Sequence, residues 1–202
     1  MSRRKSHVAT IGFIGVVLLA ACNGAAEGRL VDVVEYYNAA LDHYFMSSLA
    51  DDIDALDGGK FPGWARTGHR FYAYSGAAEH ASPVCRFYLP PEDGDSHFYS
   101  ASPAECADAR VRFPSFHFES ANVMYAGLPD PVTGACLFPW TPVYRLWNRR
   151  ADSNHRYTTD WTTRAQMISK GYVAEGYGPD GVAMCSPPVP VIFGPTPRFQ
   201  RY

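Results

Sequence analysis

Several signatures of well-known enzyme classes are missing from this sequence. It has no Gly-x-Ser-x-Gly elbow, no His-Glu-x-x-His helix, no phosphate-cradling glycine loop and no Cys-x-x-Cys pair. In many enzymes these motifs supply a nucleophile, zinc ligands or a phosphate-binding backbone. Their absence argues against those enzyme classes, and we expect neither a cofactor nor a metal.

Basic residues are also scarce. The chain has 18 Lys and Arg residues against 20 Asp and Glu residues. A protein that binds nucleic acid neutralises phosphates with a basic patch or tail, and no such cluster follows the first few residues. We therefore do not expect nucleic acid as a partner. The content of 47% hydrophobic and 14% aromatic residues is ample for one packed domain.

An apolar run near the N-terminus is too short for a membrane-spanning helix. It extends over residues 11–21, behind two arginines and a lysine, and is about half of the roughly 20 residues that a bilayer requires. A basic start followed by such a run is typical of a cleaved secretory signal peptide. We expect this signal peptide to comprise residues 1–21.

The residues around the expected cleavage site resemble a bacterial lipobox. Leu19, Ala20 and Ala21 precede Cys22, and the resemblance implies a lipid on the Cys22 thiol. Asn23 directly follows this cysteine, which resembles the pattern that directs bacterial lipoproteins to the outer membrane. We expect a lipid-anchored protein of the bacterial cell envelope, in the outer membrane and facing the periplasm or the surface. The alternative is an ordinary signal peptide that leaves Cys22 as an incidental thiol.

One seven-residue motif, which we call the phrase, occurs three times in the remaining chain. It reads DHYFMSS at 42–48, SHFYSAS at 96–102 and NHRYTTD at 154–160. Each copy follows a β-rich run, which reads VVEYYN from 33, VCRFYL from 84 and VYRLWN from 143. Units of this size cannot bury their own apolar face, so they are expected to pack on one another.

A helix start follows each phrase. Five residues after the histidine stand Ser48, Ser102 and Asp160, all residue types that cap helices well. Ser102 and Glu105 also have the spacing of a capping box. A further strand region follows each helix, so each unit is predicted to contain two strands, a short helix and another strand.

These units predict a mainly β (α+β) domain with pseudo-threefold symmetry, built as a trefoil or as a small closed ring of sheets. The predicted organisation is a tether at 22–31, a domain at 32–187 and a Pro-rich tail at 188–202. Within the domain the units span about 32–80, 82–135 and 141–187.

Four cysteines besides Cys22 predict two disulfides in an exported chain. Three pairings are possible, and the sequence alone does not choose among them. We favour Cys85 with Cys106, which closes a loop inside unit two. We also favour Cys136 with Cys185, which ties the start of unit three to its last strand.

The segments VCRFY, SHFYSASPAEC, VYRLWN and NHRYTTD resemble a bacterial repeat domain of unknown function. Its consensus is close to Tyr-Arg-x-Tyr-Asn, His-Phe-Tyr-Thr-Thr, a Glu-containing helix and Gly-Trp-x-x-Glu-Gly. The family occurs in haemagglutinin-like surface proteins and beside secreted hydrolases, so the resemblance implies a binding module of the cell surface or envelope. Unit one departs from the pattern at Glu35, Phe45 and Thr67, which indicates a unit that does not bind.

The candidate ligand-binding residues combine carboxylates, imidazoles and aromatic rings. Carboxylates accept hydrogen bonds from sugar hydroxyls, while an aromatic ring stacks on the apolar face of a sugar. The candidates are His97, Tyr99, Glu119, Trp147, His155, Tyr157 and Glu175.

Structural explanations compete with this site. Each histidine can be a packed residue bonded to the backbone, and ion pairs of Arg86 with Glu119 and of Arg145 with Glu175 can orient the units. Three histidines around one axis are also a conceivable metal site. A glycosidase would need Glu119 and Glu175 as its acid and base.

The sequence therefore predicts a non-catalytic, lectin-like envelope lipoprotein. Its expected partner is a glycan or cell-wall polymer, with the membrane contacted through the lipid anchor alone. One alternative is a structural or protein-interaction module of the envelope, and a weaker one is a glycan-cleaving hydrolase.

Overall fold

The computed structural model describes residues 28–189. The predicted signal peptide, Cys22 and residues 190–202 of the Pro-rich tail lie outside the described residues. The first strand begins at Leu30 and so includes the last two residues of the expected tether. Within residues 28–189, no helix is both long enough and apolar enough to cross a membrane.

The order strand, strand, helix, strand occurs in all three predicted units, with an added 3-10 turn in unit two and a further strand in unit three. Unit one contains β1 (Leu30–Asn38), β2 (His43–Ser47), α1 (Ala50–Asp57) and β3 (Trp64–Tyr74). Unit two contains β4 (Ala81–Leu89), a 3-10 turn η1 (Pro91–Asp93), β5 (Ser96–Ser100), α2 (Pro103–Arg112) and β6 (His117–Gly127). Unit three contains β7 (Thr141–Trp147), β8 (His155–Thr158), α3 (Trp161–Ser169), β9 (Val173–Glu175) and β10 (Val182–Ser186).

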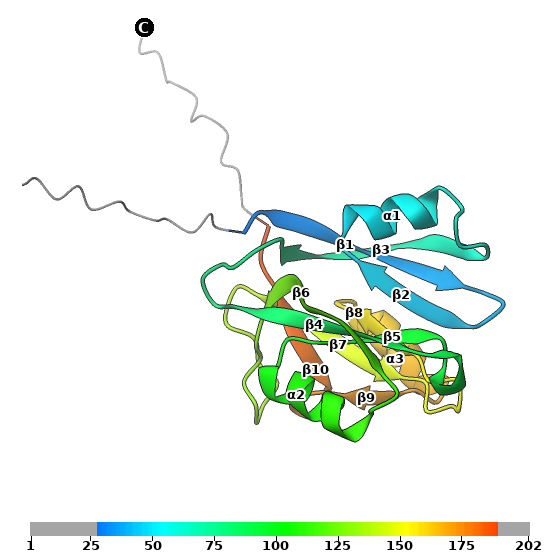
Figure 1. Cartoon of the computed structure of the whole chain (residues 1–202). Coiled ribbons are helices and arrows are strands. Elements are labelled where there is room, and N and C mark those ends of the chain that lie inside the picture. Colours follow the sequence, from blue (N-terminus) through cyan, green and yellow to red (C-terminus); the bar gives the residue numbers. More distant parts are fainter. Residues whose placement is uncertain (1–27, 190–202) are drawn as a thin grey trace, which may run out of the picture.

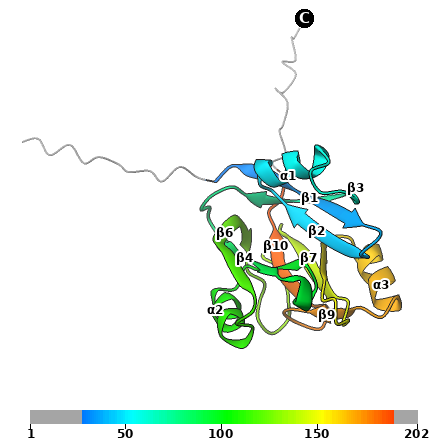
Figure 2. The ribbon, with the colours of Figure 1, turned by 45° about the vertical axis from the view of Figure 1, so that its right-hand side comes forward.

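The ten strands form one antiparallel sheet, which confirms a mainly β fold (Figure 1). Its main path runs β2-β1-β3-β6-β10-β7-β8, with β4 and β5 branching from β6 and β9 from β7. The path ends at β2 and β8 and does not close into a barrel. The three helices lie on the outside of the strands at separate places (Figure 2).

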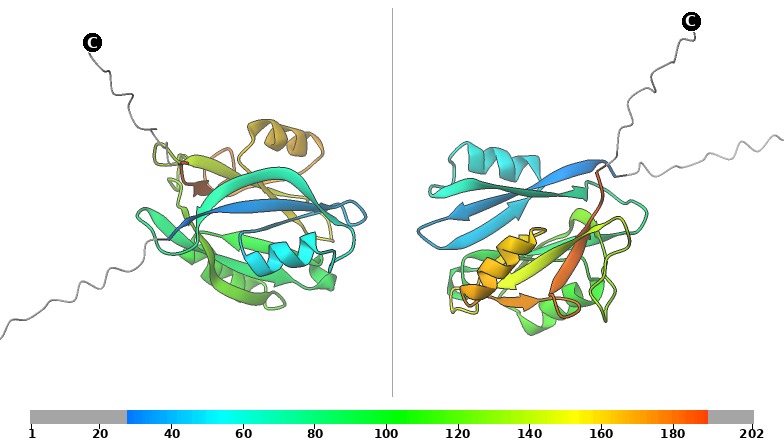
Figure 3. Two further views of the ribbon diagram at one scale, coloured as in Figure 1. Left: turned by 90° about the horizontal axis from the view of Figure 1, so that it is seen from above. Right: turned by 180° about the vertical axis from the view of Figure 1, so that it is seen from behind.

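The two ends of the described chain lie on the same side of the molecule (Figure 3). Leu30 pairs with Tyr74 at the end of β3, and the Ser186 hydroxyl donates to the carbonyl of Tyr72. Residues 28 and 189, the two ends of the described chain, therefore lie near each other.

The core sits where the second strands of the three units meet. Met46, Tyr99 and Tyr157 are all buried in one apolar cluster. The Tyr99 hydroxyl donates to the Met46 carbonyl at 2.6 Å, and the Tyr157 hydroxyl donates to the Tyr99 carbonyl at 3.0 Å. These bonds satisfy the buried phenols, as a dry core requires.

Strand register shows that the phrase in unit one is displaced by one residue. Met46 pairs with Glu35, whereas Tyr99 pairs with Arg86 and Tyr157 with Arg145. Compared with units two and three, unit one has one more residue between its histidine, His43, and Ser47, which ends the strand. The residue that matches Tyr99 in register is therefore Met46 rather than Phe45.

The extra residue also moves the helix cap. The predicted cap at Ser48 is wrong, because α1 has its N-cap at Leu49, without a side-chain bond. The predicted cap at Ser102 is confirmed by its bond from the Glu105 N–H, and Asp160 accepts from two backbone N–H groups of α3.

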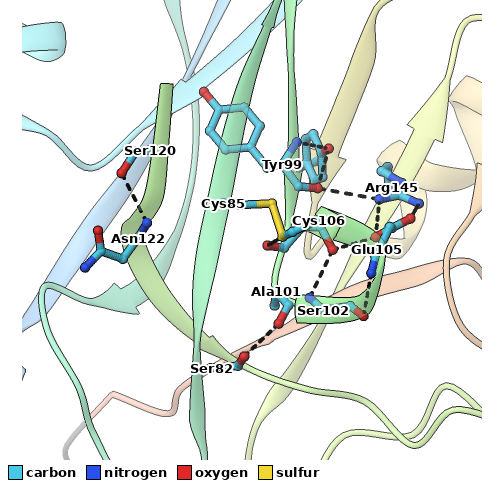
Figure 4. The surroundings of a disulfide bond; sticks show 12 residues. Ser82, Cys85, Tyr99, Ala101, Ser102, Glu105, Cys106, Ser120, Asn122 and Arg145 are labelled. Atoms are coloured by element: carbon cyan, nitrogen blue, oxygen red, sulfur yellow. Dashed lines mark hydrogen bonds and ion pairs between the residues drawn. A yellow bond between two sulfur atoms is a disulfide. The ribbon is translucent and has the colours of Figure 1, made fainter. Parts of the chain in front are cut away.

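The capping box of α2 is only half formed. The N–H of Ser102 donates to the Ser100 hydroxyl, not to Glu105. The Glu105 carboxylate instead accepts from Ser100 and from Arg145 of the next unit (Figure 4). Glu105, which the sequence predicts as part of a local capping box, thus forms a bond between units two and three.

Both favoured disulfides are confirmed. Cys85 in β4 is bonded to Cys106 in α2 (Figure 4). Cys136, in the segment before β7, is bonded to Cys185 in β10. Each bond fastens an outer segment onto a buried strand.

Candidate functional site

The candidate residues fall into two clefts rather than one site. His97 and Glu119 line a cleft between units one and two, which we call the first cleft. His155 and Glu175 line a cleft between units two and three, the second cleft. In each cleft, one unit supplies strand residues and the preceding unit supplies its helix.

The two clefts have volumes suited to small ligands. The first cleft encloses about 560 Å³ and the second about 380 Å³, within the usual range for small-molecule sites. The first is lined by Tyr44, Phe45, Asp51, Asp52, Ala55, Leu56, Lys60, Phe61, Trp64, Arg86, Tyr88, Asp95, Ser96, His97 and Glu119. The second is lined by Phe98, Glu105, Asp108, Ala109, Arg112, Phe113, Phe116, Arg145, Trp147, Ser153, His155 and Glu175.

Arg145 organises the floor of the second cleft. Its Nη2 donates to Glu105 Oε1 at 2.6 Å, across the boundary between units (Figure 4). Its Nε lies 3.6 Å from Glu175 Oε2, and that oxygen lies 3.0 Å from His155 Nε2. The guanidinium therefore sits between two carboxylates, one of which also holds the imidazole.

Arg86 has the same role in the first cleft. Its Nη1 donates to Asp52 Oδ2 of α1 at 2.6 Å, and its Nε lies 2.6 Å from Glu119 Oε2. His97 Nε2 lies 3.3 Å from the same Glu119 oxygen. The predicted pairs of Arg86 with Glu119 and of Arg145 with Glu175 are both present, each with a histidine attached.

Aromatic rings form the walls above these polar floors. In the second cleft Phe113 and Phe116 stack with centroids 4.7 Å apart, and Trp147 is half-buried. In the first cleft Phe61 is 48% exposed, beside Trp64. Exposed rings next to carboxylates offer both stacking and hydrogen bonding to a ligand.

Three of the cleft carboxylates, Glu175, Glu105 and Glu119, have lowered pKa values. Burial by itself would raise the pKa of Glu175, but the bond from His155 and the charge of Arg145 outweigh it and lower that pKa. The pKa of Glu105 is likewise lowered, because Arg145 and Ser100 outweigh its burial. The pKa of Glu119 is lowered through His97 and Arg86 against the same cost of burial.

His155 is kept neutral at physiological pH. Burial lowers its pKa from the ordinary 6.5, and the charge of Arg145 acts in the same direction. The bond to Glu175 opposes this shift without reversing it. A neutral imidazole can donate from one nitrogen and accept at the other.

The site predicted from the sequence includes two residues that the fold buries. Tyr99 is 2% exposed and Tyr157 is 4% exposed, and neither lines the first or second cleft. Their rings belong to the core and are not available for stacking. Trp147 does line the second cleft, where its indole N–H donates to Ser153.

The sequence did not single out several residues that line the clefts. Tyr88 pairs with His97 as Trp147 pairs with His155, so strand register would have indicated its place. Asp52 and Glu105 are helix acids whose bonds to the next unit carry no local sequence signal. The candidates also do not include the wall residues Phe61 and Phe113.

The third histidine of the repeated phrase has a different setting. His43 is buried, with its Nε2 3.4 Å from Asp152 Oδ2, and it lines neither cleft. Among residues 28–189, no group of three potential metal ligands is arranged to hold an ion.

These features define a mainly β domain in which neighbouring units share polar clefts. The chain belongs to the family described as "Domain of unknown function (DUF5648)", which matches residues 18–126 and 133–182. No curated protein and no solved structure matches the chain significantly.

Proposed function

We propose that this chain is a non-catalytic envelope lipoprotein whose domain binds carbohydrate in the two clefts. The observation that carries the proposal is the repeated combination of an Arg–Glu–His floor with an exposed aromatic wall. A sugar presents the matching chemistry, since it has apolar C–H faces and a rim of hydroxyls that both donate and accept.

Unused hydrogen-bonding capacity in the second cleft supports this proposal. Within residues 28–189, Arg145 Nε and His155 Nδ1 are buried and have no hydrogen-bond partner. Buried donors and acceptors normally find partners. Because neither atom is exposed to solvent, a hydroxyl group in the cleft would supply these bonds after a shift of the Arg145 or His155 side chain.

The charge of the clefts favours a neutral ligand over an anionic one. Each arginine is already compensated by two carboxylates, and each cleft is lined by more carboxylates than Lys and Arg side chains. An added anion would face repulsion that the arginine cannot offset.

Binding without hydrolysis is favoured by the same geometry. Glu119 and Glu175, the acid and base that a glycosidase would need, line different clefts. In the second cleft Glu105 and Glu175 both have lowered pKa values. General acid catalysis needs one carboxyl group with a raised pKa, so this pair suits hydrogen bonding.

The proposed location rests on Cys22. We propose that its thiol carries a lipid and holds the domain at the outer membrane, facing the periplasm or the surface. If so, a Cys22→Ser variant leaves the membrane fraction and loses the mass of the lipid. An unchanged distribution and an unchanged mass would contradict the anchor.

We also propose that the three units are related by a pseudo-threefold axis. The common order of elements, the equivalent register of Arg86 with Tyr99 and Arg145 with Tyr157, and the separated helices support this symmetry. Whether the units match a trefoil is tested by superposing them in a crystal structure of the domain.

A protein-interaction module is the second candidate. It is favoured by exposed apolar side chains before β7, where Leu137 is 55% exposed and Phe138 is 91% exposed. Such a patch can mark a contact with another protein. It lies away from both clefts, so Leu137→Ser and Phe138→Ser variants distinguish the two functions.

The test uses the mature chain with Cys22→Ser and three neutral probes, maltotriose, cellotriose and chitotriose. Loss of a hydrogen bond to a charged group costs about 1.5 to 3 kcal/mol, or roughly tenfold or more in affinity. We therefore expect Glu175→Gln to weaken calorimetric binding of a probe at the second cleft by at least that factor. The matched control is Glu79→Gln, an exposed carboxylate outside the clefts.

Binding that is indifferent to Glu175→Gln in a folded variant would contradict the assignment of the second cleft. An acidic trisaccharide, trigalacturonate, is expected to bind more weakly than the neutral probes. Preference for the acid would contradict the charge argument.

A further inference from the structure

The boundary between units three and one differs from the two clefts. Glu35 stands in β1 where the other units have arginine, and Arg156 of β8 reaches it. Arg156 Nε donates to Glu35 Oε2 at 2.9 Å, and Nη2 donates to Oε1 at 2.8 Å. In the two clefts, the first strand of a unit supplies the arginine and the preceding unit supplies a carboxylate. In this bidentate ion pair the first strand supplies the carboxylate and the preceding unit supplies the arginine.

Arg156 occupies a place that holds phenylalanine at the other boundaries. Consecutive side chains of a strand point to opposite faces. Along β5, His97 lines the first cleft and Phe98 the second. Along β8, His155 lines the second cleft while Arg156 points to Glu35 and lies 4.2 Å from the centroid of the Tyr44 ring.

Packing around this pair leaves no room for a ligand. Glu35 is 4% exposed and Arg156 is 7% exposed. Thr67, which replaces the cleft glutamate, donates its hydroxyl to Glu35 Oε1 at 2.7 Å. The cavity beside Glu35 measures about 10 Å³, on the order of the space that a single water molecule requires and far too small for a sugar.

We infer that each chain carries two saccharide sites of the same design, in the first and second clefts, and that the Glu35–Arg156 pair closes the third boundary. This inference rests on the proposed function. Its partner is a glycan with a repeated neutral residue, because two like sites on one chain recognise the same residue twice. Two sites on one anchored molecule raise the avidity for such a polymer without any new contact.

The test is the stoichiometry of binding to the mature Cys22→Ser chain. Maltotriose, cellotriose and chitotriose are titrated calorimetrically, and the parent chain is expected to bind two molecules of any probe that it recognises. Glu119→Gln removes the first cleft and Glu175→Gln the second, so each variant is expected to bind one molecule. The double variant is expected to bind none, and Glu79→Gln retains two.

A second pair of variants guards against loss of folding. Phe61→Ala in the first cleft and Phe113→Ala in the second remove exposed wall residues, 48% and 47% exposed, without opening the core. They are expected to weaken binding at one site each. Circular dichroism and the melting temperature identify any variant that is not folded.

The outcomes separate the two proposals. One bound molecule, abolished by only one of the two glutamate variants, overturns the bivalent chain and leaves the proposed function standing. Three bound molecules overturn the closed boundary. Failure of all three probes to bind the folded parent overturns both the proposed function and this inference.

Discussion

Glu175 connects a buried base to a buried cation. It lies 3.0 Å from His155 and 3.6 Å from Arg145, and its partly exposed carboxylate faces the second cleft. One carboxylate oxygen thus bonds to the imidazole, while the Glu175 side chain remains 31% exposed. At the scale of single residues, the pH dependence of stability follows from this arrangement.

Protonation of His155 is expected to destabilise the fold. Its pKa is lowered in the folded state by burial, from 6.5, so between that folded value and 6.5 the unfolded chain binds the additional proton. Stability is therefore fully present above pH 6.5 and decreases as the pH falls below it. Chemical denaturation between about pH 7.5 and pH 5 measures this slope, above the range where the cleft carboxylates titrate.

Two variants test the assignment of that slope. His155→Asn removes the group and is expected to flatten the decrease, whereas His69→Asn, at an exposed histidine, leaves it unchanged. A slope that survives His155→Asn would mean that another group is responsible.

The Glu35–Arg156 pair is expected to be sensitive to loss of one partner. Because both side chains are buried, Arg156→Leu leaves an uncompensated carboxylate and should reduce the free energy of unfolding by about 3 to 5 kcal/mol. Glu35→Leu together with Arg156→Leu removes both charges and should recover most of the loss. Urea unfolding of the three chains measures it.

An exposed ion pair provides the comparison. Arg70 and Asp32 lie 3.3 Å apart with side chains 60% and 42% exposed, so solvent screens their attraction. Arg70→Leu is expected to have a much smaller effect than Arg156→Leu. Equal effects would mean that the Glu35 pair is not buried in solution.

At the scale of elements, the helix caps differ in what they contribute. The Ser102 hydroxyl accepts from the N–H of Glu105, so Ser102→Ala should cost about 1 kcal/mol of stability. Ser48 does not cap α1, and its hydroxyl makes only a long bond of 3.4 Å to the Val123 carbonyl, so Ser48→Ala should change stability by less than about 0.5 kcal/mol. Thermal or urea unfolding distinguishes the two, and a larger effect at Ser48 would contradict the cap at Leu49.

Local sequence signals were sufficient for most elements. Alternating apolar residues in the runs from 33, 84 and 143 predict β1, β4 and β7, and Ser102 and Asp160 mark the starts of α2 and α3. Unit one misled the prediction because its histidine lies one residue further from the strand end. Only the pairing of Glu35 with Met46 reveals the displacement.

At the scale of the whole molecule, contacts between distant residues form the clefts. Asp52 and Arg86 are 34 residues apart, Glu105 and Arg145 are 40 apart, and Glu35 and Arg156 are 121 apart. No local pattern predicts such pairs. The sequence could therefore indicate the strand residues of the site, but not the helix acids or the closed third boundary.

The disulfides restrain the whole chain to different extents. Their loops span 21 residues for Cys85–Cys106 and 49 residues for Cys136–Cys185. Restriction of the unfolded chain predicts a stabilisation of about 3 kcal/mol for the first and about 4 kcal/mol for the second. Urea unfolding of the paired Cys→Ala variants measures each contribution, and no loss for either bond would contradict the pairing.

A crystal structure of the domain soaked with the neutral trisaccharides would show directly whether the two clefts bind sugar. We expect sugar density in the second cleft, with a ring against Phe113 or Trp147 and a hydroxyl within hydrogen-bonding distance of Glu175. Equivalent density is expected in the first cleft beside Glu119. Sugar bound only outside both clefts, or two open clefts that stay empty at saturating sugar, would contradict the proposed function.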